Sequence, residues 1–264
     1  MLTQRVQSHL RALHALVWQP LKGPLGGRGR VLIVPHGPLG SVPFAALHDG
    51  ESCLAEQLQI AFAPSARMAL RALQCAPRAA HRVIALGEST RLPQAEHEAN
   101  AVAGLLQQGQ AFVGAQATLA NLRAHGEGAD VVHLACHAQF RSDNPAFSAL
   151  HLADGVLTAE TIETLRLPGA IVALSGCETA LTEFSSTDEM FGLTRAFLVA
   201  GASRVVAALW PVDDATAAEW MFDFYAGLRR GHAPAAALRQ AQLAMRRRRP
   251  HPFHWASFSL MGGW

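Results

Sequence analysis

The sequence predicts an α/β protein with a mostly parallel central sheet and helices on both faces. Short runs of consecutive apolar, often β-branched residues recur along the 264-residue chain. Such runs are typical of strands that are buried on both faces. Segments with apolar residues at helical spacing separate these runs. The alternation favours a parallel sheet whose helical connections cover both of its faces.

The first segment of the chain is expected to be an amphipathic helix. Over residues 2–18 the apolar side chains at helical spacing are Val6, Leu10, Leu13, Leu16 and Val17. The Gly- and Pro-rich stretch 22–29 is then expected to break the chain. We expect residues 1–20 to form an N-terminal helix that can dock on the rest of the domain or on a partner.

The remaining elements follow in alternation. The predicted strands are residues 30–35, 82–87, 129–136, 170–174 and 203–209. The predicted helices are residues 94–106, 118–124, 189–200, 215–229 and 234–248. Residues 150–157 predict a hairpin with Asp154-Gly155 at its turn. Three helix ends are also indicated, because Gly201 suits a positive φ after a helix, Asp213 or Asp214 suits an N-cap, and Pro234 suits a first helical turn.

Composition narrows the class of protein. Half of the residues are hydrophobic, which is enough for one domain over residues 1–264 with a substantial core. No run of 18 or more apolar residues predicts a membrane span, and the N-terminus lacks the apolar stretch of a secretory signal. We therefore expect a cytoplasmic location and no membrane partner.

The formal net charge of +2 demands no polyanionic partner. One exception is the arginine run 246–249, which we expect to face solvent at the end of a helix, where cations complement the macrodipole. A contact of this run with nucleic acid or with a partner is the alternative.

The four cysteines, Cys53, Cys75, Cys136 and Cys177, are expected to be free thiols. No two of them have the C-x-x-C spacing of zinc or redox sites, and a disulfide framework is typical of much shorter chains. We therefore expect no metal site. This leaves open which of the thiols carries chemistry.

Two predicted strands end in residues suited to nucleophilic catalysis. One is followed by His137, and another by Gly176 and Cys177. Ligands of open α/β sheets bind beyond the carboxyl ends of the strands, so these residues would meet if the two strands are neighbours. A thiol needs a base within hydrogen-bond reach to become a thiolate, and a glycine suits a sharp strand exit. The alternative is that Cys177 is a small apolar residue and His137 a core histidine.

The residues around His137 and Cys177 are assigned to the oxyanion site, to the core or to the wall of the cleft. The backbone N–H groups of Ala138 and Cys177 would point into the same space and could bind an oxyanion. Cys136 alternates with His137 along a strand, so we expect its side chain in the core. His133 and His137 have a spacing that suits a metal on a helix but not on a strand. Trp210 is expected to pack at a strand end or to line the cleft.

Several motifs then resemble one family over nearly the whole chain. They are Val132-His-Leu-Ala-Cys-His-Ala138, Val172-Ala-Leu-Ser-Gly-Cys-Glu-Thr179, Phe191-Gly-Leu-Thr-Arg-Ala-Phe197, Val205-Val-Ala-Ala-Leu-Trp-Pro211 and His251-Pro-Phe-His-Trp255. Together they are similar to the CHAT family of caspase-like cysteine peptidases. The resemblance implies a caspase-like three-layer sandwich, a catalytic pair at His137 and Cys177, and no cofactor.

Two positions depart from the acidic residues of related peptidases. His36 stands where the family often has an acidic residue, and Ser175 stands where metacaspase relatives have an aspartate two residues before the nucleophile. We expect both to contribute to substrate binding. Neither can neutralise a buried arginine, so we expect an uncharged residue before the cut bond, unless Asp154, Asp188 or Asp213 reaches in from a loop.

The resemblance implies a cysteine endopeptidase that cleaves a specific protein. CHAT domains commonly follow tetratricopeptide-type helical repeats, and this sequence shows no such repeat. The alternatives are an isolated domain, a fragment of a longer protein, or a subunit controlled in trans. We expect control by a partner such as a helical-repeat protein. The alternative is a catalytically silent interaction module on the same fold.

Overall fold

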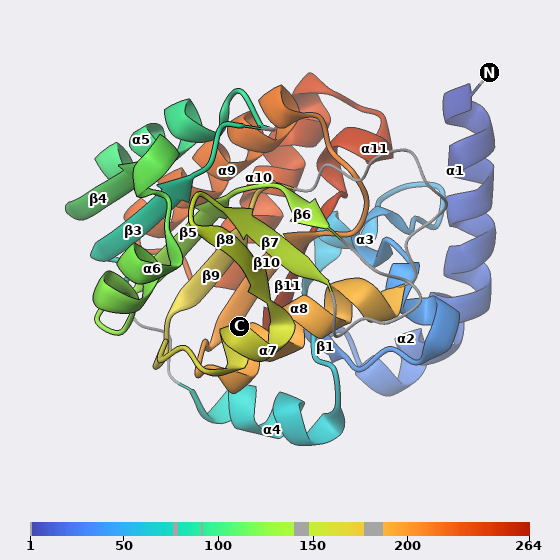
Figure 1. The fold of residues 1–264 in the computed structure, drawn as a ribbon. Helices are drawn as coiled ribbons and strands as arrows, with labels where there is room; N and C mark the ends of the chain where they lie inside the picture. Colours follow the sequence, from blue (N-terminus) through green and yellow to red (C-terminus); the bar gives the residue numbers. More distant parts are fainter. Residues whose placement is uncertain (1, 76–78, 91, 140–147, 177–186) are drawn as a thin grey trace.

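The structure, a computed structural model, describes residues 2–75, 79–90, 92–139, 148–176 and 187–264 (Figure 1). Within these residues the main sheet has eight strands in the order β1-β2-β11-β10-β9-β5-β3-β4. Its strands are β1 (Arg30–Ile33), β2 (Gln59–Phe62), β3 (Arg82–Gly87), β4 (Gln108–Val113), β5 (Val131–Ala135), β9 (Ile171–Leu174), β10 (Arg204–Ala208) and β11 (Phe258–Gly262). All residues of β5, β9, β10 and β11 are buried. The continuous apolar runs of β5, β9 and β10 predicted this burial.

The sheet is mostly parallel, as predicted, but it changes direction once. β11 runs antiparallel to β10, whereas the other neighbouring pairs described in this sheet are parallel. β10, β9, β5, β3 and β4 therefore share one direction, and β1, β2 and β11 run the opposite way. The carboxyl ends of these two groups open on opposite edges of the sheet.

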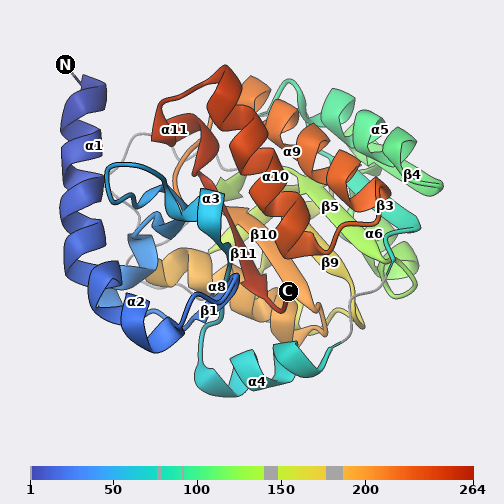
Figure 2. The same cartoon turned by 180° about the vertical axis from the view of Figure 1, so that it is seen from behind.

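Helices cover both faces and complete three layers. One face carries α5 (Ala95–Leu105), α9 (Asp214–Arg229) and α10 (Pro234–Arg248), which stand in front in Figure 2. The other face carries α6 (Leu119–Gly126), α7 (Ala159–Glu163) and α8 (Thr187–Val199). A second sheet lies over this face, formed by β6 (Ala138–Gln139), β7 (Ala149–Leu152) and β8 (Gly155–Thr158). Three further short helices are α3 (Leu54–Gln57), α4 (Ala66–Gln74) and α11 (Pro252–Trp255).

The predicted helix ends and hairpin are confirmed. Oδ1 of Asp213 accepts the N–H of Thr216 at 3.0 Å and caps α9. Gly201 follows α8 with a φ of 103°, and Pro234 is the first residue of α10. β7 and β8 pair as an antiparallel hairpin around Asp154-Gly155. These features depend on local sequence, which explains why the sequence predicts them.

Three strands of the main sheet were not predicted. β4 carries exposed glutamines at the sheet edge, so it lacks the apolar run of a central strand. β2 has only four residues. β11 includes a serine and a glycine, although every one of its residues is buried. Their assignment to the sheet depends on pairing with distant strands, which local periodicity does not report.

The N-terminal helix is longer than expected. α1 (Leu2–Leu13) continues through a π-helical turn (His14–Trp18) into α2 (Gln19–Leu25), along the side of the molecule (Figures 1 and 2). The break expected from Lys22 onward occurs only at Gly26, whose φ of 58° ends α2. The glycine and proline residues up to Leu25 are thus accommodated within the last helical turns.

The N-terminal helical segment attaches to the domain through one apolar stripe that includes an imidazole. Leu10, His14 and Trp18 are buried, at 4–5 % exposure, whereas Leu16 is 75 % exposed. Burial lowers the pKa of His14 below its ordinary value, although the carboxylate of Asp49 acts in the opposite direction. The folded state therefore favours the neutral imidazole.

We predict that the docking of this segment weakens in acid. His14 has a lowered pKa when folded, so the unfolded state binds its proton more readily, and stability falls as the pH decreases below about 6.5. His14→Gln should remove that part of the pH dependence. Thermal unfolding at about pH 7.5 and about pH 5.5 tests this, because His14 titrates between these values. An equal loss of stability in the two proteins on acidification would contradict the assignment.

Candidate active site

The strands that precede His137 and Cys177 are neighbours. β5 and β9 pair in parallel, with Leu134 opposite Leu174. The pairing continues past the end of β9, because the N–H of Ser175 donates to the carbonyl of Leu134 at 3.0 Å. The predicted meeting of the two carboxyl ends at one sheet edge is therefore confirmed.

His137 follows β5 at this edge and is half-buried. Its carbonyl accepts the N–H of His151 at 2.9 Å, and the two imidazole rings lie 5.2 Å apart between centroids. Nε2 of His151 lies 3.3 Å from Oε1 of Gln139. His151 is a site neighbour that the sequence analysis missed, and its position in the predicted hairpin was the available signal.

Gly176 brings the exit of β9 against the exit of β5. A Cβ at this position would lie 2.1 Å from the carbonyl oxygen of Cys136 and 2.5 Å from Cδ1 of Leu92. No side chain fits between these atoms, so the close approach of the two strand exits requires glycine. Cys177 and Glu178 lie outside the described residues. The pairing of Cys177 with His137 therefore stays a prediction.

The backbone of Ala138 suits the predicted oxyanion donor. Because the carbonyl of His137 accepts from His151, these two residues form a hydrogen-bonded pair of the antiparallel ladder. Ala138 is the next residue, opposite Leu150, so its N–H points away from β7. β6 is an edge strand of the small sheet. The Ala138 N–H is thus directed to the side that β7 does not occupy.

Cys136 and His133 are interior residues. Cys136 is 1 % exposed within the main core, as its alternation with His137 predicted. His133 is fully buried, with Nδ1 3.0 Å from the hydroxyl of Tyr225. Its Nε2 lies 3.2 Å from Oε1 of Glu98, but not in hydrogen-bonding geometry, so this contact is electrostatic. Among the described residues, His, Cys, Asp and Glu form no group of three or more suited to a metal.

Ser175 faces the interior of the protein. Its side chain is 4 % exposed, and its hydroxyl donates to Oε1 of Glu98. Glu98 is 3 % exposed on the buried face of α5, together with Ala95, Ala99 and Val102. Glu98 was not predicted as a site residue, although a glutamate within an apolar i, i+3, i+4 pattern is a visible signal in the sequence.

His36 lies away from this edge. It is exposed and follows β1, which is four strand positions from β9 and runs in the opposite direction. Four strand spacings amount to about 19 Å, and the carboxyl end of β1 opens on the other edge of the sheet. The structure therefore does not bring His36 to the sheet edge of Ser175 and His137, because the sheet reverses at β11. A role of His36 in substrate binding stays a prediction.

Two of the three loop carboxylates named for this site, Asp154 and Asp213, are engaged elsewhere. Oδ1 of Asp154 accepts the N–H of Leu119 at the start of α6, at 2.8 Å. Asp213 caps α9, and the side chain of Asp188 lies outside the described part of the chain. Glu88, which follows β3, is 7 % exposed and accepts the N–H of Thr90 at 2.9 Å.

Trp210 follows β10 and packs, as expected at a strand end. Its Nε1 donates to the carbonyl of Phe253 at 2.9 Å, and the two rings stack with centroids 6.2 Å apart. This contact fixes the segment around α11 to the end of β10. Phe253 remains 44 % exposed, so the pair presents an aromatic surface.

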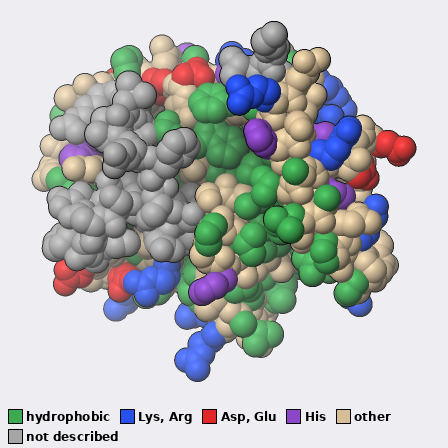
Figure 3. All heavy atoms as spheres, turned by 90° about the vertical axis from the view of Figure 1, so that its right-hand side faces the viewer, with side chains coloured by type: hydrophobic (Ala, Val, Ile, Leu, Met, Phe, Trp, Pro, Cys, Tyr) green, Lys and Arg blue, Asp and Glu red, His purple; other side chains and the backbone are tan. Residues whose placement is uncertain are grey.

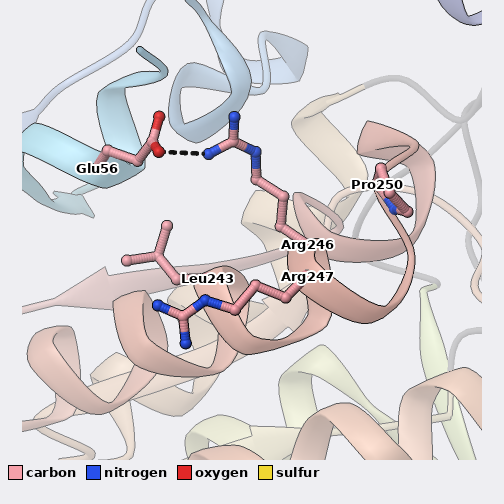
Figure 4. A pocket seen from close by; sticks show the side chains of 5 residues that line it. All are labelled: Glu56, Leu243, Arg246, Arg247 and Pro250. Atoms are coloured by element: carbon pink, nitrogen blue, oxygen red, sulfur yellow. Dashed lines mark ion pairs between the residues drawn. The ribbon is translucent and has the colours of Figure 1, made fainter.

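Arg246, Arg248 and Arg249 of the arginine run at the end of α10 are paired within the chain. Arg246 contacts Glu56 at 2.7 Å beside an open cavity of about 430 Å³ that Arg247 also lines (Figure 4). Arg248 pairs with Asp223, and Arg249 pairs with Glu219. The run thus lies at a helix end facing solvent, as predicted. In the part of the chain that the structure describes, we find no helix of sufficient length and hydrophobicity to span a bilayer.

Comparison with known proteins identifies relatives of the whole chain. A family model described as the CHAT domain matches residues 7–263. Human Tetratricopeptide repeat protein 28 is 27 % identical over an alignment that covers 96 % of this chain, and its mouse counterpart is 28 % identical. This chain spans only 13 % of the length of these two proteins.

Solved structures share the fold. Separase from the Saccharomyces cerevisiae separase–securin complex matches with a TM-score of 0.63 and 13 % identity, over 88 % of this chain and 15 % of separase. The Arg-specific cysteine proteinase gingipain R, the RgpB protein of Porphyromonas gingivalis, matches with a TM-score of 0.59 and 9 % identity, over 97 % of this chain and 66 % of that one. The fold of this chain is therefore caspase-like.

We predict that Gly176→Ala damages the junction of the two strand exits. The new methyl group would overlap the carbonyl of Cys136, so the backbone must shift, at about 1–3 kcal/mol. Gly104→Ala in α5 is the matched control, because nothing lies within 4 Å of its Cβ position. Urea denaturation should show a loss of stability for the first variant and no loss for the second. Equal stabilities would contradict the close approach.

Proposed function

The chain belongs to the CHAT domain family, and on that premise we propose that it is a cysteine endopeptidase that cleaves a protein substrate. The observation that carries the proposal is the junction of β5 and β9, where Gly176 packs against the carbonyl of Cys136 beside His137. The residue after Gly176 is Cys177. The caspase-like fold supports the same reading, since it is the fold of gingipain R, a cysteine proteinase.

In the proposed mechanism His137 takes the proton of the Cys177 thiol, and the thiolate attacks the scissile carbonyl. The N–H groups of Ala138 and Cys177 stabilise the oxyanion of the tetrahedral intermediate. His137 then protonates the leaving amine, and water releases the acyl group. The proposed mechanism uses no cofactor, and a backbone carbonyl suffices to orient the imidazole.

A catalytically silent interaction module is the second candidate, and the curated relatives favour it because they are named for their repeats. Labelling with a thiol-reactive peptide electrophile distinguishes the peptidase from the silent module. Burial raises the pKa of Cys53 to about 11, and Cys136 is buried, so Cys75 is the main competing thiol among Cys53, Cys75 and Cys136. Selective labelling of Cys177 in a Cys75→Ser protein supports the peptidase.

We predict that Cys177→Ala and His137→Ala each lower peptide hydrolysis by at least about 1,000-fold, because each removes half of the nucleophile–base pair. Cys136→Ala should retain activity and lose about 1 kcal/mol or more of stability through a small core cavity. The assay is hydrolysis of a peptide library with folding checked by circular dichroism. Full turnover by Cys177→Ala would reject the mechanism.

We also propose a preference for an uncharged residue before the cut bond. A cationic residue would need a carboxylate in the pocket. Of the carboxylates that the structure describes, Glu88, Glu98, Asp154 and Asp213 are already engaged by groups of this chain. Ser175 contributes its backbone at this edge, while its hydroxyl faces Glu98.

A fluorogenic panel that varies only this residue tests the preference. Alanine or leucine substrates should be cleaved faster than the arginine substrate. An arginine substrate cleaved about 100-fold faster would contradict it, because that ratio, about 2.7 kcal/mol, requires a carboxylate in the pocket.

We further propose that a helical-repeat protein or segment controls the peptidase through the N-terminal helical segment. The curated relatives are tetratricopeptide repeat proteins much longer than this chain. Hydrophobic side chains gather on the face that holds α1 and α2 (Figure 3), and Leu16 and Leu21 are 75 % and 46 % exposed. Such exposed apolar residues are typical of a docking face. The proposed location is the cytoplasm. We propose no nucleic-acid partner, because Arg246, Arg248 and Arg249 are paired with carboxylates of the chain itself.

We predict low basal activity of the isolated chain and stimulation by such a partner. The double variant Leu16→Glu/Leu21→Glu should keep the basal rate and lose the stimulation, because charges would be placed in the apolar contact. Leu70→Glu on α4, 65 % exposed, is the matched control. Hydrolysis is measured with and without a tetratricopeptide-repeat protein of the same organism. High activity of the chain alone, unaffected by the partner, would count against control in trans.

A further inference from the structure

A buried polar cluster links the two strands that lead to the candidate active site. Its members are Glu98 on α5, Ser175 after β9, His133 on β5 and Tyr225 on α9. Each of the four side chains is at most 4 % exposed. The proposed reaction uses none of them. A buried carboxylate is costly unless donors satisfy it, so the cluster requires an explanation.

The contacts of the cluster converge on one carboxylate oxygen. The hydroxyl of Ser175 donates to Oε1 of Glu98. Nε2 of His133 lies 3.2 Å from the same oxygen, outside hydrogen-bonding geometry, so this contact is electrostatic. Nδ1 of His133 lies 3.0 Å from the hydroxyl of Tyr225, and which of the two donates depends on the tautomer of the ring. Burial, together with the nearby Glu98, raises the pKa of Tyr225 well above its ordinary value, so the phenol keeps its proton. One carboxylate oxygen thus contacts a side chain that follows β9 and a side chain of β5.

Ser175 and His133 both stand close to the proposed catalytic pair along the chain. Ser175 is two residues before Cys177, and His133 is four residues before His137. Ser175 also donates its N–H to Leu134 of β5, so its backbone and side chain are both held. A shift of the β9 exit relative to β5 would break the contact with Glu98. A buried charge–hydroxyl contact of this kind resists such a shift more than apolar packing does.

We propose that Glu98 is a positioning residue for the peptidase reaction, which holds the exits of β9 and β5 at a fixed separation through Ser175 and His133. The proposal rests on the proposed function. The role requires an acceptor oxygen on a side chain of the length of glutamate. A glutamine at position 98 keeps an oxygen at the same distance, so it should largely substitute for the glutamate. Leucine, which fills the volume without an acceptor, should not.

The test is the rate at which iodoacetamide alkylates Cys177 near pH 7. Trypsin places the four cysteines on separate peptides, so mass spectrometry reads Cys177 alone. Ser175→Ala and Glu98→Leu should each slow alkylation by about 10-fold, since a small misplacement of a reacting group has an effect of this size or larger. Glu98→Gln should stay within about 3-fold of wild type, and the double variant Glu98→Leu/Ser175→Ala should be no slower than the slower single variant.

Ser203→Ala is the matched control for a purely structural effect. Ser203 is also 4 % exposed and makes buried hydrogen bonds, but it precedes β10 at the opposite sheet edge. It should leave Cys177 alkylation unchanged even if it lowers the melting temperature. In peptide hydrolysis, Ser175→Ala should lower kcat and leave KM close to wild type.

The outcomes separate the two proposals. Normal alkylation in Ser175→Ala, or equal slowing in Ser175→Ala and Ser203→Ala, overturns the positioning role of Glu98. If iodoacetamide alkylates Cys177 as fast in His137→Ala as in the wild type, the assignment of the catalytic pair is wrong. The positioning role is then rejected as well. Slow alkylation in His137→Ala together with normal alkylation in Ser175→Ala rejects only the positioning role.

Discussion

The rest of the structure depends on the parallel pairing of β5 with β9. This pairing sets Leu134 opposite Leu174 and extends to the N–H of Ser175. It also brings Gly176 so close to the carbonyl of Cys136 that a side chain has no room. Two segments about 40 residues apart in the sequence thereby leave the sheet at the same edge, where ligands of α/β proteins bind.

The layers on either side of this pair differ in chemistry. On the side of α5 and α9, the strand pair meets a buried carboxylate, an imidazole, a phenol and a hydroxyl, whereas Cys136 enters the apolar core. A buried ionic or polar group contributes less to stability than well-packed apolar side chains of the same volume. The presence of this polar cluster next to the strand exits fits the positioning role proposed for Glu98. The junction is thus held by glycine packing and by polar contacts together.

The reversal of the sheet at β11 divides the strands into two groups that open on opposite edges of the sheet. The five strands that share a direction open on the edge of His137, and the ends of β10 and α11 meet there through Trp210 and Phe253. The other three strands open on the opposite edge, and His36 lies there. The N-terminal helical segment runs beside the domain with exposed leucines, so a partner on that face need not cover the candidate site directly.

The sequence by itself determined the elements with strong local signals: the apolar strands β3, β5, β9 and β10, the amphipathic helices, the cap at Asp213, and the motifs at His137 and Cys177. These depend on periodicity and on residues a few positions apart. Only the tertiary structure decided the strand order, the reversal at β11, the separation of His36 from the site, and the contact of Ser175 with Glu98. The physical reason is that pairing and burial between distant segments depend on how the whole sheet closes around its core, which no local pattern encodes.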